Sequence, residues 1–347
     1  MGPGRSRLRS SLDSILPSVY PESGADDRAH QMSLLRSRSR WLRIDLMRAL
    51  ELKFVCKSYD GVVAVDRLSL AISEGCIYGL LGTNGAGKTT VLRMMVGVLI
   101  PDHGGVCIFG EPFERRHLKM IGYLPEERGL YRKAKIGELL LYLGELKGLG
   151  RSTTQHRIME LAERLGIDAA LTQRIEELSK GMEQKIQLLT AMIHDPQLLI
   201  LDEPFAGLDP LNSALLMELL LELKRTGRTI LFSSHRMDRV ERLCDEICLI
   251  NHGRSVLQGG VTELKERFGG RRVRLVYRGG ARVPNKDGLI ESCRLGDDMV
   301  ELRVGPDEDA QELLRTLAAS ATIVSYETVE PSLEEIFIEA VGTHHAV

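Results

Sequence analysis

Hydrophobic and polar positions change their period along the chain, and these changes predict where strands and helices lie. Residues 52–56 alternate with a period of two, as a strand with one buried face does, and residues 62–72 are expected to supply a further strand. Residues 76–81 and 198–201 are short, wholly apolar runs, which are typical of strands buried on both faces of a sheet. A further strand is expected at residues 229–233. The chain is therefore expected to contain a strand-rich first part and a buried sheet.

Apolar residues spaced three or four apart predict helices between these strands. Because strands and helices alternate, the region is expected to form an α/β core with a mainly parallel sheet. A helical insert at about residues 130–190 interrupts this alternation. The expected helices cover residues 88–99, 139–149, 157–165, 183–194, 211–225 and 239–243.

Gly269 and Gly270 mark a boundary after which the pattern changes again. Residues 270–343 are expected to form a small α+β domain without a catalytic constellation of its own. Its predicted strands cover residues 272–277, 299–304 and 322–328, and its predicted helices cover residues 309–319 and 333–341.

Composition and charge narrow the function classes. The 347 residues are 43% hydrophobic and 27% charged, as expected of globular domains. A net charge of −2 gives no support to a nucleic-acid partner, because such proteins carry a strongly basic surface. No apolar run approaches the roughly eighteen residues that a membrane helix needs, so a separate chain would have to supply any membrane spans.

The cysteines are spread along the chain, and no second pair completes a zinc site at the usual spacing. Cys244 and Cys248 would share one face if their segment were helical, which leaves half a metal site as an alternative. Buried free thiols in a reducing compartment are the favoured interpretation. The six are Cys56, Cys76, Cys107, Cys244, Cys248 and Cys293.

Residues 1–48 differ in composition from the rest, with nine arginines and no lysine. The favoured interpretation is a disordered extension, or upstream sequence read from an early start codon with Met47 as the natural beginning. The arginines leave a transit peptide or an anionic-membrane contact as alternatives. Glu22, Asp26 and Asp27 argue against the transit peptide.

One glycine-rich segment, with a predicted strand before it and a predicted helix after it, matches the pattern G-x-x-x-x-G-K-[ST] in full. Its glycines would let backbone N–H groups close around phosphate oxygens at a helix N-terminus. Lys88 would bridge the β and γ phosphates of a nucleotide, and Thr89 would place its hydroxyl on Mg²⁺. This P-loop comprises Gly82, Thr83, Asn84, Gly85, Ala86, Gly87, Lys88 and Thr89, and Thr90 follows it as a further candidate.

Two acidic residues follow the apolar run at residues 198–201. Asp202 ends a strand of the same sheet and can reach the Mg²⁺ shell beside Thr89. Glu203 would face the γ-phosphate, where a carboxylate can orient and deprotonate the attacking water. On their own, the two residues would suggest a strand end with exposed charges. Downstream of a P-loop, catalysis is the favoured interpretation.

Further segments in a fixed order make the chain resemble the nucleotide-binding subunit of an ABC transporter over about residues 50–265. Residues 178–182, Leu-Ser-Lys-Gly-Met, are similar to the signature sequence of that family, and residues 206–209 resemble its D-loop. His235 resembles its switch histidine. Tyr59 stands where the family has an aromatic side chain that stacks on adenine.

The resemblance implies a fold and an assembly. The fold is an α/β P-loop NTPase core over residues 50–268, with a mainly parallel sheet, an N-terminal antiparallel β part and the helical insert. The assembly is a homodimer, or a pair with a second ABC ATPase, that binds ATP at its interface. Ser179 and Gly181 of one copy would contact the γ-phosphate held by Lys88 of the other. Ser179 on its own would be interpreted as a helix N-cap, and the two roles are compatible.

Two departures from the family pattern point to one branch. Lys180 and Met182 replace residues of the family's LSGGQ consensus, and Glu126 stands where the Q-loop usually has glutamine. Together with the motif at residues 331–337, they resemble the ATPases of bacterial sodium and drug exporters. Those ATPases pair with ABC-2-type membrane subunits and often carry a C-terminal accessory domain. Glu126 would still act as a Mg²⁺ ligand and coupling sensor.

The expected function is therefore ATP hydrolysis that drives export of an ion, drug or other small solute through a separate membrane subunit. The chain would be cytoplasmic and peripheral on the inner face of the cell membrane. The main alternative is a soluble ABC ATPase acting on ribosomes or DNA, but a second cassette, coiled coils and zinc modules are not found in the sequence. A nucleotide sensor without turnover would lack Glu203 or His235, and both are present.

Overall fold

A six-stranded sheet forms the centre of the fold. The computed structural model describes residues 48–127, 129–269, 271–278, 289–294, 299–304, 314–315, 318–319 and 322–344. All but the last residue of the N-terminal extension expected at residues 1–48 lies outside the described residues. Most of the helix predicted at residues 309–319 also lies outside them. The strands are β3 (Ile77–Leu81), β6 (Ile121–Leu124), β7 (Leu198–Leu201), β8 (Thr229–Ser234), β9 (Glu246–Asn251) and β10 (Arg254–Gly260).

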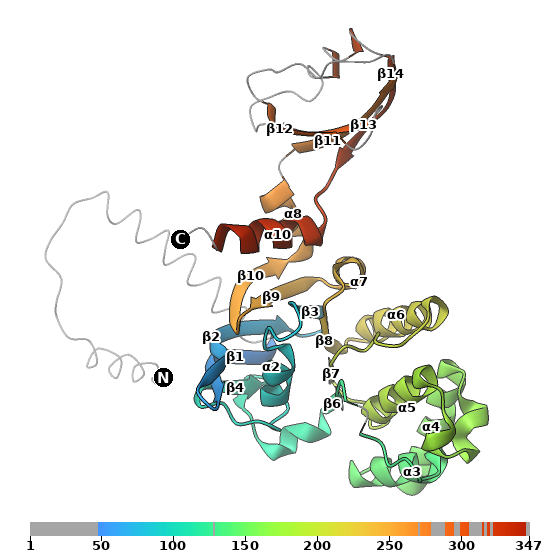
Figure 1. Cartoon of the computed structure of the whole chain (residues 1–347). Coiled ribbons are helices and arrows are strands. Elements are labelled where there is room, and N and C mark those ends of the chain that lie inside the picture. Colours follow the sequence, from blue (N-terminus) through green and yellow to red (C-terminus); the bar gives the residue numbers. More distant parts are fainter. Residues whose placement is uncertain are drawn as a thin grey trace, which may run out of the picture. The chain divides into compact units, whose positions relative to one another are not determined.

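The topology of this sheet brings four loops to one edge. The strand order is β10-β9-β3-β8-β7-β6, and all neighbours are parallel except β9 and β10. Parallel strands end at the same edge, so the loops that follow β3, β6, β7 and β8 meet there. The prediction of an α/β core with a mainly parallel sheet is confirmed (Figure 1).

A second sheet of four antiparallel strands precedes and flanks this core, in the order β2-β1-β4-β5. The helix α2 (Lys88–Met95) shares a hydrophobic core with both sheets, in which its Leu92 packs together with Leu50 and Leu80. The helix that follows the P-loop is thereby held between two sheets. The strands are β1 (Arg48–Tyr59), β2 (Val62–Ser73), β4 (His103–Ile108) and β5 (Glu111–Pro112).

The predicted helical insert is present between β6 and β7 and consists of three α-helices and two short 3₁₀ turns. Its helices pack on one another through buried leucines and isoleucines such as Leu140 and Leu161. The elements are α3 (Ile136–Leu146), α4 (Arg151–Leu165), η3 (Asp168–Thr172), η4 (Ile175–Glu177) and α5 (Lys180–Met192); a further 3₁₀ turn, η2 (Arg115–Lys119), precedes β6.

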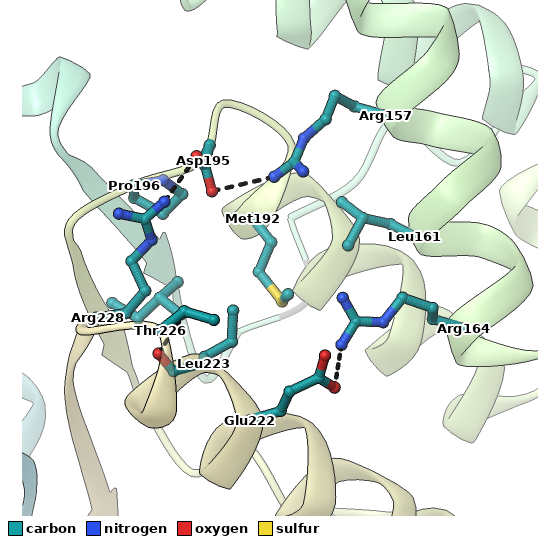
Figure 2. A pocket seen from close by; sticks show the side chains of 11 residues that line it. Arg157, Leu161, Arg164, Met192, Asp195, Pro196, Glu222, Leu223, Thr226 and Arg228 are labelled. Carbon is teal, nitrogen blue, oxygen red and sulfur yellow. Dashed lines mark hydrogen bonds and ion pairs between the residues drawn. The ribbon is translucent and has the colours of Figure 1, made fainter.

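Ion pairs tie α4 to the rest of the core around a small pocket of about 170 Å³ (Figure 2). Asp195, in the turn after α5, accepts from Arg157 of α4 at 3.2 Å and from Arg228 at 2.7 Å. Arg164 of α4 pairs with Glu222 at 2.5 Å. All the charged side chains named here have partners, so they join the insert to the core.

The last helices of the core are α6 (Pro210–Arg225), α7 (Met237–Leu243) and α8 (Val261–Gly269). A third sheet follows, with the antiparallel order β12-β13-β11-β14, and the chain continues into α10 (Leu333–His344). Leu333 and Ile336 of α10 are buried in the same hydrophobic cluster as Val240 of α7. The strands are β11 (Arg271–Arg278), β12 (Leu289–Arg294), β13 (Met299–Val304) and β14 (Thr322–Val329).

Among the described residues, Cys56, Cys76, Cys107, Cys244 and Cys248 are free thiols. Cys76, Cys244 and Cys248 are buried. Cys244 follows α7 and Cys248 lies in β9, so the two do not share a helix face. Burial raises the pKa of Cys76 to about 12 and that of Cys248 to about 11. Within the described residues, none of the helices is both long and apolar enough to cross a bilayer.

Candidate nucleotide site

The P-loop is a tight turn whose glycines the backbone requires. It connects the end of β3 to the first residue of α2, as the sequence predicts. Gly87 has φ +105°, and a Cβ atom there would lie 2.5 Å from the carbonyl oxygen of Ala64. A Cβ atom on Gly82 would lie 2.4 Å from the carbonyl oxygen of Ile250. Gly85 also has a positive φ, +80°, with open space where its side chain would be. The loop thus presents bare backbone at a helix N-terminus, which suits a phosphate.

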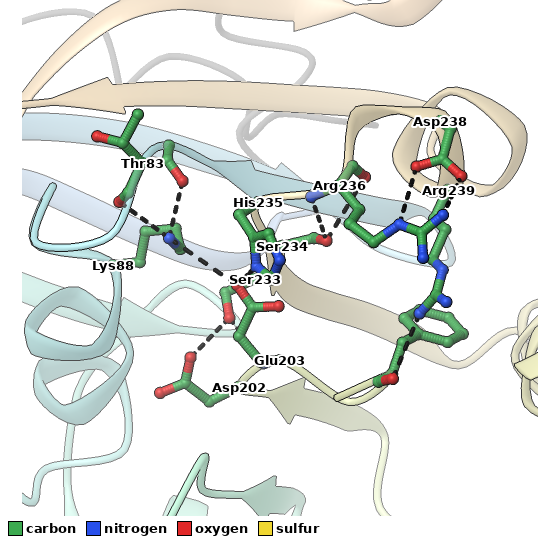
Figure 3. A network of polar contacts seen from close by, with 12 residues as sticks. Thr83, Lys88, Asp202, Glu203, Ser233, Ser234, His235, Arg236, Asp238 and Arg239 are labelled. Atoms are coloured by element: carbon green, nitrogen blue, oxygen red, sulfur yellow. Dashed lines mark hydrogen bonds and ion pairs between the residues drawn. The ribbon is translucent and has the colours of Figure 1, made fainter. Parts of the chain in front are cut away.

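Lys88 is buried at the start of α2 and folds back over the loop. Its Nζ donates to the carbonyl oxygens of Gly82, at 2.8 Å, and Thr83, at 3.1 Å (Figure 3). The same atom lies 3.9 Å from Glu203 Oε1. A single ammonium group therefore stands between the phosphate-binding loop and the nearest carboxylate of the site.

Asp202 directly follows β7 and is 1% exposed. Its Oδ1 accepts from Ser233 Oγ at 2.6 Å. Its Oδ2 is buried and has no hydrogen-bond partner among the described residues. A buried carboxylate oxygen without a partner is costly unless a cation binds it, so this atom fits a ligand of Mg²⁺.

Ser233 belongs to the segment 233–235 that ends with the predicted switch histidine, but the sequence analysis gave it no role of its own. It lies fully buried near the end of β8, and its Oγ also accepts from the backbone N–H of Glu203 at 2.9 Å. One hydroxyl therefore orients Asp202 and the backbone of Glu203 together. The available signal was a polar residue at the end of an apolar strand predicted to lie in the same sheet.

Glu203 has an unusual backbone and a close partner. Its φ is +47°, a left-handed conformation that non-glycine residues adopt at a cost and that the surrounding contacts must hold. Its Oε1 lies 3.0 Å from Nδ1 of His235, which follows β8. The carboxylate is thus held between an imidazole and the Lys88 ammonium group.

A cavity of about 520 Å³ opens over the P-loop and collects most of the predicted residues. Tyr59 reaches it from the end of β1, and Glu126 reaches it from the loop after β6. Ala64 of β2 also lines it, although the sequence offers no sign of this. The lining consists of Tyr59, Ala64, Asn84, Gly85, Gly87, Lys88, Thr89, Thr90, Glu126, Asp202 and Glu203.

Ser179 and Gly181 do not line this cavity. Ser179 is exposed and caps α5, where its Oγ accepts from the backbone N–H of Met182 at 3.3 Å. The prediction that Ser179 is a helix N-cap is confirmed. Its hydroxyl and the first turn of α5 are accessible at the surface of this copy.

Comparison with known proteins establishes the family. A family model described as "ABC transporter" matches residues 65–206, and one described as "ATP-binding protein DrrA1-3-like, C-terminal domain" matches residues 259–341. The chain is 42% identical over 294 residues to the uncharacterized ABC transporter ATP-binding protein YhaQ of Bacillus subtilis, which covers 84% of this chain and 98% of that protein. The chain therefore belongs to the ABC transporter ATP-binding proteins.

A second relative and a solved structure agree with this assignment. The Nod factor export ATP-binding protein I of Sinorhizobium fredii is 39% identical over 275 residues, which cover 77% of this chain and 78% of that protein. A structure titled as the ATP-binding subunit of an ABC transporter is 30% identical, covers 63% of this chain and 93% of that chain, and has a TM-score of 0.60. The chain is an ATPase subunit of an ABC transporter, a class whose members bind ATP, dimerise and work with membrane permease subunits.

Proposed function

We propose that this subunit drives export of an ion, drug or other small solute through a separate ABC-2-type membrane subunit. It would lie in the cytoplasm on the inner face of the cell membrane, held there by that partner. The name of the Sinorhizobium relative includes export, which supports the direction. Residues 50–268 would form the catalytic domain and residues 270–343 an accessory domain.

The observation that carries the catalytic part is the unpaired, buried Oδ2 of Asp202 beside the P-loop cavity. Asp202, Thr89 and Glu126 would hold Mg²⁺, since all three line the cavity and offer oxygen atoms. The chemistry that Mg²⁺ would supply there is neutralisation of part of the phosphate charge.

The remaining residues would act directly on ATP and water. Lys88 and the P-loop backbone N–H groups would bind the phosphates, while Tyr59 would stack on the adenine. Glu203 would orient the attacking water and accept its proton. His235 would hold the Glu203 carboxylate in place through its Nδ1 contact at 3.0 Å.

The N-terminus of α5, which carries Ser179 and Gly181, would contact the ATP bound by the other copy. Ser179 and Gly181 lie outside the cavity of their own chain, and Ser179 is exposed. A second copy, or a second ABC ATPase, would bring this helix N-terminus onto the γ-phosphate at the other Lys88. The helix N-terminus favours an anion in that position.

The membrane partner would dock on the helical insert near Glu126. Three large apolar side chains there are exposed, Tyr131 by 72%, Tyr142 by 59% and Leu146 by 69%. Tyr142 and Leu146 are four residues apart on α3 and so share a face. Exposed apolar side chains that share one helix face, as Tyr142 and Leu146 do, are typical of a protein interaction site.

Inverted membrane vesicles that contain this chain and a candidate ABC-2-type permease test the proposal. Vesicles should accumulate substrate when ATP is added outside, and Tyr142→Glu should abolish accumulation while the basal ATPase rate stays the same. Met159→Glu, at an exposed position of α4, is the matched control. ATP-driven loss of substrate from loaded inverted vesicles would contradict export. Full transport by the Tyr142→Glu variant would contradict the proposed docking face.

A further inference from the structure

The helix α5 buries two glutamine side chains, although glutamine is mostly exposed in folded proteins. Gln184 is 6% exposed and Gln187 is 5% exposed. They are three residues apart, so their side chains leave α5 on the same side. A buried amide destabilises the fold unless it finds hydrogen-bond partners, so the partners of these two amides matter.

Gln184 holds the turn that carries Glu203. Its Nε2 donates to the carbonyl oxygen of Pro204 at 3.1 Å. The acceptor is a backbone carbonyl, so only the NH₂ side of the amide can make this bond. Glu203 has φ +47° immediately before that proline, a conformation that persists only when its surroundings hold it. Ser233 holds the same turn from the β8 side, through the Glu203 N–H.

Gln187 reaches the turn that carries Glu126. Its Nε2 donates to the carbonyl oxygen of Glu127 at 3.4 Å. The carboxylate of Glu127 forms an ion pair with Arg93 of α2 at 3.0 Å. The residue directly after Glu126 is therefore held on one side by the helix that follows the P-loop and on the other by α5.

We propose that Gln184 and Gln187 are positioning residues, through which α5 holds the backbone turns that carry Glu203 and Glu126. This inference rests on the proposed function, in which those carboxylates act on ATP and Mg²⁺ and Ser179 meets the nucleotide of the other copy. The N-terminus of α5 and its two amides belong to one rigid helix. Contact of Ser179 with the second nucleotide is thereby transmitted to both carboxylates of its own copy.

The first test uses full-length Gln184→Met, which keeps the side-chain length and removes the donor. Its kcat should fall about tenfold while KM for ATP stays within about twofold. In the Glu203→Gln background, the yield of ATP-trapped dimer by size exclusion should be the same with and without Gln184→Met. Gln155→Met, at an exposed position of α4, is the control and should behave as the wild type.

Two results would overturn the role of Gln184. An unchanged kcat would show that the bond to Pro204 does not position Glu203. A loss of trapped dimer as large as the loss of kcat would show that the substitution damages α5 itself. If the Glu203→Gln variant hydrolyses ATP as fast as the wild type, the catalytic role proposed for Glu203 fails, whatever the glutamine variants do.

The second test uses Gln187→Met in the Glu203→Gln background and reads nucleotide binding rather than turnover. The Mg²⁺ concentration that gives half-maximal ATP-trapped dimer should rise at least about threefold, because the Glu126 turn loses its contact with α5. Gln155→Met again provides the control. An unchanged Mg²⁺ requirement would remove Gln187 from the proposal.

Discussion

At the scale of single residues, Ser233 joins the two acidic residues of the site through one hydroxyl group. Its Oγ donates to Asp202 and accepts from the Glu203 backbone N–H. A hydroxyl can make both bonds because it carries one donor and two acceptor lone pairs. One hydroxyl group therefore positions both the proposed metal ligand, Asp202, and the backbone of the proposed base, Glu203.

Replacing Ser233 by alanine should lower kcat for ATP about fivefold and leave KM within about twofold, because a hydrogen bond of this kind contributes about 1 kcal/mol. Steady-state ATPase assays measure both constants. Ser213→Ala is the matched control, since Ser213 is also buried but its hydroxyl has no hydrogen-bond partner among the residues described. Equal kcat values for the two variants would show that the Ser233 hydroxyl does not support the site.

His194 makes stability depend on pH. Burial lowers its pKa to about 4 from 6.5, and Lys147 adds to the shift. Below pH 6.5 the unfolded chain takes up a proton that the folded chain does not take up until near pH 4. The contribution of His194 to stability is therefore complete above pH 6.5 and falls by on the order of 3 kcal/mol as the pH drops to 4.

Urea unfolding of a His194→Met variant at several pH values tests this dependence. The variant should lose less stability than the wild type between pH 6.5 and pH 4, because it has no imidazole to protonate. His156→Met, at an exposed position of α4, should keep the wild-type slope. A His194→Met slope equal to that of the wild type would rule out the histidine as the cause.

At the scale of elements, the ion pairs of Asp195 join α4 to the strand-bearing core. Asp195 is 54% exposed and its arginine partners are about a quarter exposed, so solvent screens both pairs. Asp195→Asn should lower the free energy of unfolding by about 1 kcal/mol. Asparagine tolerates the φ of +55° at this position, so the backbone should remain as it is.

Urea unfolding compares Asp195→Asn with Asp168→Asn, a change of the same kind at an exposed position of η3. The Asp168→Asn variant should have the stability of the wild type. A stability loss that is equal in both variants would mean that the two arginine contacts are not the cause. Raising the salt concentration should reduce the difference between them.

The patterns that predicted elements best were short apolar runs and strict alternation. The run at residues 198–201 coincides with β7, and the alternating residues 299–304 coincide with β13. A wholly apolar run is informative because a strand buried on two faces has apolar residues throughout, so the first polar residue marks its end. The buried centre of the fold was therefore the easiest part to predict.

Elements that depend on partners or on caps were harder to predict. The strand β4 begins with a histidine and two glycines and was not predicted, since its pairing with β1 overrides its weak propensity. The helix α2 ends at Met95 rather than at residue 99, because Gly97 adopts φ +68°. The strands β9 and β10 and the helix α8 were also missed.

The site shows the same division. The P-loop, Asp202 and Glu203 could be located from the sequence, because each lies at the end of a predicted strand or the start of a predicted helix. The role of Ser233 in the site could not be predicted, because it depends on the strand register that pairs Leu201 with Phe232. Hydrogen bonds across the sheet follow from that register, and periodicity along the chain does not contain it.

At the scale of the whole molecule, one copy holds a cavity and a separate helix N-terminus that does not line it. The proposed sandwich accounts for both features, since each copy would complete the site of the other. The exposed face around Tyr142 would then connect the closure of two copies to the membrane subunit. Hydrolysis at Glu203 would reopen the pair.

The most direct test of this account compares ATP hydrolysis and size exclusion for the wild type and Glu203→Gln. The account predicts that the wild type hydrolyses ATP, and that the variant loses at least about a hundredfold in kcat because it lacks the base. It also predicts that the variant elutes as a dimer with ATP and as a monomer without it. A Glu203→Gln variant that hydrolyses ATP at the wild-type rate and remains monomeric in ATP would contradict the central claim.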